Sequence, residues 1–138
     1  MSAVIVREFP NVKELVRNVD EQVSALRQQL MELVKRLEDV RIRAEHERKL
    51  REIFKALGTE PPSSSRSIDL GAVRLVVNPG AEDESKALEE AIDRANKALQ
   101  ALQAARKALE PLAGADVEFK ILVIYRDGVP AMILVKPP

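Results

Sequence analysis

Few residues of this 138-residue chain have types and spacings that could support catalysis. The single histidine, His46, lies between Glu45 and Glu47. Catalysis needs matched titratable groups in a cleft, whereas carboxylates at helical spacing, such as Glu89 and Asp93, are typical of a solvated helix face. The chain has no cysteine, and one histidine cannot form a histidine metal cluster. We therefore expect no enzyme, no metal and no cofactor.

Two short motifs could bind or carry an anion. Asn78-Pro79-Gly80 precedes a predicted helix, whose free N–H groups could hold an anion. The acidic residues 82–84 follow at once and would repel it. The run Ser63-Ser64-Ser65-Arg66 could be phosphorylated, but a flexible loop tip is the simpler interpretation. Neither motif predicts a small-molecule substrate, and the chain has no glycine-rich phosphate loop.

A basic cluster on the first predicted helix is a candidate contact for nucleic acid or another anion. Its members are Arg41, Arg43, Arg48 and Arg51. Nucleic-acid binders usually combine a basic excess with aromatic stacking, whereas this chain has a net charge of +0 and 3% aromatic residues. Nucleic-acid association is therefore our alternative function. The cluster is either free or paired with acids of the second helix.

The elements that must position these residues are two long helices and several short β-prone segments. The predicted order is β-α-β-α-β-β, in one elongated α+β domain over residues 1–138. The expected elements are a strand at 2–9, a helix at 11–57, a helix at 81–112 and a β-hairpin at 116–136 that turns at Asp127-Gly128. Residues 66–77 form either one strand with a glycine bulge or a short hairpin that turns at Gly71-Ala72.

Apolar residues recur along the first helix with steps of four and three residues, which predicts a coiled-coil seam. The stripe runs from Val12 to Ala44, fails at Glu47 and Arg51, and resumes out of phase at Leu50, Phe54 and Leu57. The second helix adds its own seam beside an alanine face, which reflects either helix propensity or close approach of another helix. The expected pairing or oligomer interface comprises Val23, Leu26, Leu30, Leu33, Leu37, Val40, Leu88, Ile92, Leu99 and Leu102.

The charge layout favours an antiparallel helical hairpin. Residues 41–57 carry six basic and three acidic groups, whereas residues 81–93 carry one basic and six acidic groups. Folding the second helix back along the first brings these blocks together. A parallel homodimer of the first helix would instead oppose like charges.

The first helix is longer than the second, so its Val12, Val16, Val19 and Val23 need another partner. We expect the first strand and the C-terminal hairpin to form a small sheet on this valine stripe. Leu122 and Ile124 lie on the opposite face of their strand, which predicts that part of the sheet is covered on both sides.

These features predict a cytoplasmic, non-enzymatic protein that associates with itself and works as a scaffold, adaptor or chaperone-like subunit. Apolar strand edges and the alanine face favour a dimer or higher homo-oligomer, and another protein is a further partner. The longest apolar runs are too short to span a membrane. In layout the chain resembles the prefoldin type, in which a helical hairpin meets a β region used for assembly. That resemblance implies that the distal helix ends hold clients.

Overall fold

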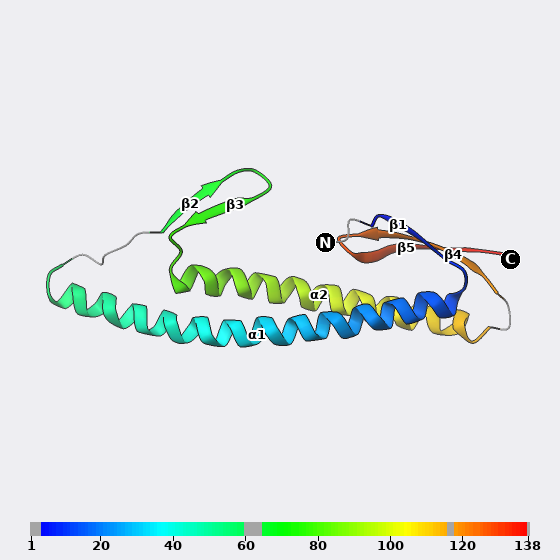
Figure 1. The fold of residues 1–138 in the computed structure, drawn as a ribbon, viewed down its shortest axis with the longest axis horizontal. Coiled ribbons are helices and arrows are strands. Elements are labelled where there is room, and N and C mark those ends of the chain that lie inside the picture. Colours follow the sequence, from blue (N-terminus) through cyan, green and yellow to red (C-terminus); the bar gives the residue numbers. More distant parts are fainter. Residues whose placement is uncertain (1–3, 60–64, 116–117, 138) are drawn as a thin grey trace. The chain divides into compact units, whose positions relative to one another are not determined.

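The computed structural model describes residues 4–59, 65–115 and 118–137. The fold is α+β: two long helices pack antiparallel and are accompanied by small antiparallel sheets (Figure 1). The described residues form two compact units, residues 1–30 with 94–138 and residues 31–93, and each helix contributes to both. The single-domain organisation stays a prediction. The predicted strand residues 2, 3, 116 and 117, and Ser63 and Ser64 of the predicted loop, lie outside the described ranges.

Helix α1, Val12–Ala56, has the ends that its sequence predicts. At its start, the Glu14 N–H donates to Asn11 Oδ1 at 2.9 Å, which satisfies a backbone donor that the helix leaves free. At its end, Gly58 has a φ of 73°. The N–H groups of Gly58 and Thr59 donate to the carbonyls of Lys55 and Phe54, both at 3.0 Å, which is the Schellman pattern.

The first unit contains a three-stranded sheet in the order β1-β4-β5. Its strands are β1 at Val6–Phe9, β4 at Lys120–Arg126 and β5 at Val129–Lys136. Both pairings are antiparallel. Asp127 and Gly128 form the predicted two-residue turn, and their φ values of 53° and 78° suit a type I′ turn.

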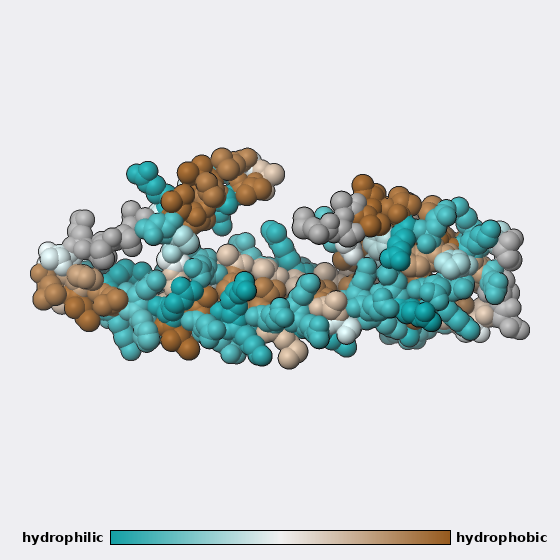
Figure 2. Space-filling model, in the orientation of Figure 1, coloured by the Kyte–Doolittle hydropathy of each residue, from teal (hydrophilic) through white to brown (hydrophobic). Residues whose placement is uncertain are grey.

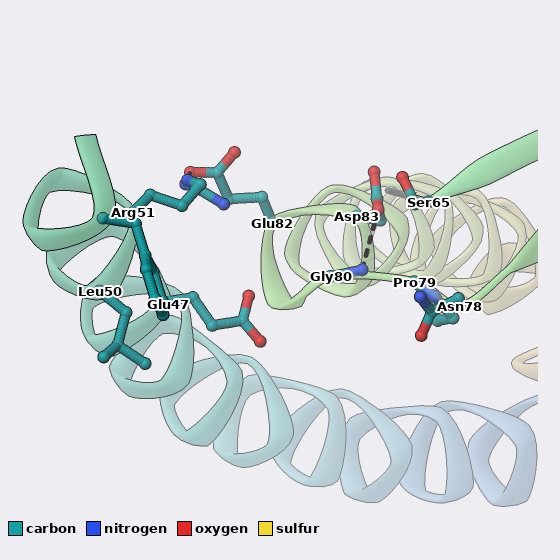
Figure 3. Close-up of a pocket in the computed structure, with 10 residues that line it drawn as sticks. Glu47, Leu50, Arg51, Ser65, Asn78, Pro79, Gly80, Glu82 and Asp83 are labelled. Carbon is teal, nitrogen blue, oxygen red and sulfur yellow. Dashed lines mark hydrogen bonds and ion pairs between the residues drawn. The ribbon is translucent and has the colours of Figure 1, made fainter. Parts of the chain in front are cut away.

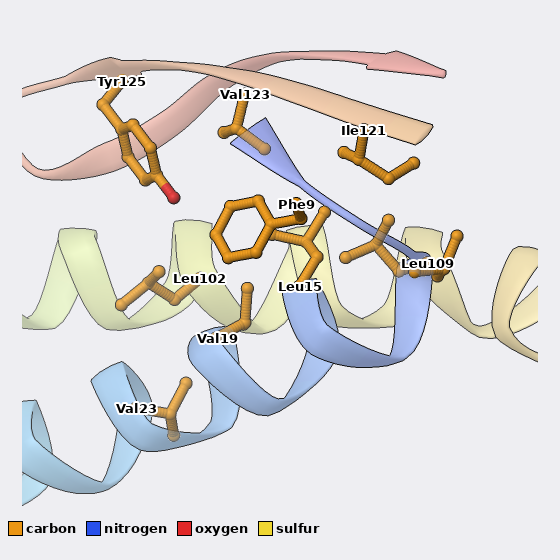
Figure 4. Packing of buried hydrophobic residues seen from close by; sticks show 10 residues of the cluster. Phe9, Leu15, Val19, Val23, Leu102, Leu109, Ile121, Val123 and Tyr125 are labelled. Atoms are coloured by element: carbon orange, nitrogen blue, oxygen red, sulfur yellow. The ribbon is translucent and has the colours of Figure 1, made fainter. Parts of the chain in front are cut away.

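The core of the first unit lies between this sheet and the two helices (Figure 4). Val12, Val19 and Val23 pack in one cluster with Ile121 and Val123, which confirms the predicted packing of the sheet on the valine stripe. Helix α2, Ala81–Ala113, adds Leu102 and Leu109 to this cluster.

Leu15 is fully buried in this core, although it lies outside the predicted seam. The sheet and α2 contact α1 from different sides, so the buried face of α1 is wider than a two-helix seam. Leu122 and Ile124, on the opposite face of β4, are half-buried. That part of the sheet is covered on both sides stays a prediction.

The second unit contains a two-stranded hairpin of β2, Arg66–Asp69, and β3, Arg74–Val77. The structure thus decides between the two predicted alternatives for 66–77, and the element order becomes β-α-β-β-α-β-β. The turn is the predicted Gly71-Ala72. The Leu70 N–H donates to the Val73 carbonyl at 2.9 Å, and Gly71 has a φ of 91°, a value that favours glycine at the first turn position.

Candidate functional site

The predicted helix-pairing residues differ in how deeply they are buried. Val23, Leu37, Val40 and Leu102 are buried, whereas Leu26, Leu30, Leu33, Leu88, Ile92 and Leu99 are half-buried. On the alanine face of α2, Ala91, Ala98 and Ala105 are half-buried and recur every seven residues, while Ala87 and Ala108 are exposed. A role for these residues between copies of the chain stays a prediction.

The sequence suggested that the seam of α1 breaks at Glu47 and Arg51. In the structure, both residues continue the seam. Both side chains are half-buried and extend from α1 toward the first turn of α2 (Figure 3). Glu47 Oε2 accepts a hydrogen bond from the Ala81 N–H at 2.9 Å, and Arg51 pairs with Glu82 at 2.9 Å. Glu47 suits its seam position because its carboxylate meets a free N–H group at a helix end, where a negative charge is favourable. Arg51 suits its position because it meets the acidic first turn of α2.

The out-of-phase apolar residues at the end of α1 were assigned wrongly to a resumed seam. Leu50 and Leu57 are 53% and 70% exposed, whereas Phe54, which keeps the original phase, is half-buried. Leu50 and Leu57 therefore remain available to solvent or to a partner.

The structure pairs every arginine of the predicted basic cluster. Arg41 pairs with Glu89 at 3.2 Å, and Arg43 pairs with Glu84 at 2.7 Å. Arg51 pairs with Glu82, and Arg48 pairs with Glu45 on the same helix. The acidic start of α2 thus neutralises three of the four arginines, as the antiparallel charge layout predicts.

A pocket of about 390 Å³ lies beside the start of α2 (Figure 3). Its carboxylates are already engaged within the chain. Asp83 Oδ2 accepts from the Gly80 N–H at 3.0 Å, Glu47 accepts from Ala81, and Glu82 pairs with Arg51. The N–H groups of Gly80 and Ala81 at this helix end already donate to carboxylates, so the Asn78-Pro79-Gly80 motif is not arranged to bind an anion. Within the described ranges, no group of three or more His, Cys, Asp or Glu side chains could hold a metal ion.

The β2–β3 hairpin carries a continuous apolar face. Residues that pair across strands share a face, so the pairs Ile68–Leu75 and Leu70–Val73 lie together with Val77. These side chains are between 45% and 65% exposed. Figure 2 shows brown, apolar atoms gathered over this hairpin. We call this surface the hairpin face. The sequence shows that apolar residues alternate along 66–77, but it does not show that the hairpin face is exposed.

The outer face of the three-stranded sheet is a second apolar surface. Val6, Ile124 and Met132 form one row across the strands, and Leu122 and Leu134 lie in the next row beside the charged Glu8. Val6 and Met132 are each 53% exposed. β5 is an edge strand, and no described strand pairs with its outer side.

Tyr125 is the polar residue of the first core. Its hydroxyl is buried and has no hydrogen-bond partner in the described chain. Burial raises the pKa of Tyr125 above its ordinary value of 10.0, and the nearby charge of Arg7 opposes this shift in part. The hydroxyl is therefore protonated at neutral pH and is not suited to act as a base.

None of the described helices has the length and apolar character needed to cross a membrane. Comparison of the chain with protein-family models, curated proteins and solved structures finds no match.

Proposed function

We propose that this protein is a cytoplasmic, non-enzymatic interaction protein that associates with itself and works as a scaffold, adaptor or chaperone-like subunit. The hairpin face is the observation that carries this proposal. A two-stranded hairpin is marginally stable alone, and this one exposes Ile68, Leu70, Val73, Leu75 and Val77 on one side. Exposed apolar patches of this kind mark sites of protein contact.

The end of α1 supports the chaperone-like form of the proposal. Leu50, Ile53 and Leu57 are between 53% and 70% exposed. In the prefoldin-like layout, apolar residues at the distal helix ends would hold unfolded segments of a client.

Nucleic-acid association is the weaker candidate because Arg41, Arg43, Arg48 and Arg51 each make an ion pair. A nucleic acid would have to compete with these carboxylates for the guanidinium groups. Such binding would use phosphate contacts, so its affinity would fall steeply with added salt and would be lost when Arg41, Arg43 and Arg48 are replaced with Glu.

The experiment measures suppression of aggregation of a chemically unfolded test protein, together with particle mass from light scattering. We expect the native chain to form oligomers and to suppress aggregation at stoichiometric excess. Replacing Ile68 and Leu75 with Ser should weaken the suppression, because it removes the centre of the hairpin face. Arg74→Ser, on the opposite face of β3, is the matched control. A monomer that leaves aggregation unchanged would refute the proposal.

A further inference from the structure

The outer edge of β5 combines three properties that suit pairing with an identical strand. The stretch Met132–Val135 is apolar and uncharged. A bulge at Ala131 precedes it, because Ile124 pairs with Met132 while Tyr125 pairs with Pro130. Pro137 follows the strand and lacks a backbone donor. The regular part of this edge is therefore Met132–Lys136, and its midpoint is Leu134.

The backbone of β5 can be oriented from the hydrogen bond on the other side of β4. The Tyr125 N–H donates to the Ile5 carbonyl at 2.7 Å, so the backbone groups of Tyr125 point toward β1. Because backbone groups alternate in direction along a strand, the N–H and C=O groups of Leu122 and Ile124 point toward β5. The N–H and C=O groups of their partners, Leu134 and Met132, therefore point back toward β4. The N–H and C=O groups of Ile133 and Val135 point the other way, to the free edge of β5.

We propose that two copies of this chain join their β5 strands antiparallel about a two-fold axis at Leu134, which makes one continuous six-stranded sheet. In this register, Ile133 of each copy exchanges both backbone hydrogen bonds with Val135 of the other. Leu134 faces its own equivalent on the outer face, and Met132 lies beside the aliphatic stem of Lys136. The inference rests on the self-association proposed above and specifies the interface.

The opposite edge of the sheet is less suited to the same role. β1 is four residues long and carries Arg7 and Glu8 at its centre. A two-fold axis at either residue would place like charges directly opposite each other, which destabilises a strand pair. β5 carries no such charge between Val129 and Val135, so it can pair with itself without this cost.

Single-cysteine variants test the register, because the chain has no cysteine of its own. Leu134 would form a non-hydrogen-bonded pair with a Cα separation of about 4.5 Å, which lies within disulfide range. We expect Leu134→Cys to form a disulfide-linked dimer under mild oxidation. Met132→Cys is the matched control on the same strand and face. Its equivalents would be about 13 Å apart, too far for a disulfide.

Val135→Pro tests the edge without a cysteine. It removes an outward N–H and blocks the edge, which an edge strand tolerates within its own sheet. We expect the dimer dissociation constant to rise at least about tenfold, with circular dichroism unchanged.

The outcomes separate this inference from the wider proposal. An oligomer in which Leu134→Cys crosslinks no better than Met132→Cys would overturn the β5 interface and leave self-association intact. An oligomer unaffected by Val135→Pro would do the same. A native chain that stays monomeric would overturn both.

Discussion

The two units of this protein pack their helices with different chemistry. In the first unit, α1, α2 and the three-stranded sheet enclose an apolar cluster in which Leu15, Val19 and Val123 have no exposed surface. Among the described residues of the second unit, the buried apolar residues are Leu37, Val40 and Ala81. Ion pairs and the Glu47 cap on α2 add to this smaller apolar seam.

This difference separates the source of stability from the source of orientation. Burial of apolar side chains supplies most of the free energy of folding. Exposed ion pairs each contribute less than about 1 kcal/mol. We therefore expect the first unit to stabilise the fold, while the charges of the second unit select the antiparallel pairing and its register.

The largest effect should come from the first core. Leu15→Ala removes a fully buried side chain and should lower the free energy of unfolding by about 2–5 kcal/mol. Leu33→Ala, the same change at a half-buried position of α1 in the second unit, should cost about 1 kcal/mol. Urea unfolding followed by circular dichroism measures both. Equal losses would contradict the contrast between the units.

An intermediate effect should come from the cap on α2. Glu47→Ala leaves the Ala81 N–H without its acceptor and should cost about 1 kcal/mol. Hydrogen exchange at the first turn of α2 should become faster. Glu52→Ala, an exposed change on the same helix, is the control and should leave this exchange unaltered. Unchanged exchange in Glu47→Ala would show that the cap does not hold the helix end.

A smaller effect should come from the ion pairs of the second unit. A double-mutant cycle with Arg43→Ala and Glu84→Ala should give a coupling below about 1 kcal/mol, because both side chains are substantially exposed. Added salt should reduce this coupling, since it screens exposed charges. A larger coupling that persists in salt would mean that the pair stabilises the fold as strongly as core burial does.

The smallest effect at neutral pH should come from Tyr125→Phe, which removes a buried hydroxyl that has no partner. Stability should be unchanged or slightly higher. Above pH 10 the unfolded state loses the tyrosine proton before the folded state does, so the native chain should become less stable as pH rises. Tyr125→Phe should lack this part of the decline. The ultraviolet absorbance of tyrosinate reports the titration directly, because Tyr125 is the only tyrosine. A measured pKa of about 10 for Tyr125 would contradict the burial of its hydroxyl.

Local signals in the sequence predicted most of the helices and turns. Asn11 and Gly58 cap α1 as expected, and Asp127-Gly128 forms the expected turn. These features depend on neighbouring residues and on backbone preferences, so a short window of sequence is sufficient to identify them. The charge blocks also predicted that the basic end of α1 lies beside the acidic start of α2, where the structure pairs Arg41 and Arg43 with acids.

The candidate surfaces were only partly predictable. The alternation at 66–77 indicated β structure, but whether a partner element covers an apolar face depends on distant parts of the chain. Leu50 and Leu57 were assigned to the seam for the same reason. Helical spacing alone cannot say that α2 begins opposite Glu47, where the helix end requires a carboxylate rather than an apolar side chain.

The sequence by itself determined the two helices, their antiparallel direction and the turn at Asp127-Gly128, because periodicity, caps and charge act over short distances or along whole helix faces. Only the tertiary structure decided that Leu15 is buried, that Glu47 caps α2, that the hairpin face is exposed, and that no other described strand pairs with the outer edge of β5. Burial is a property of what surrounds a residue in space, and the order of residues along the chain does not specify it alone.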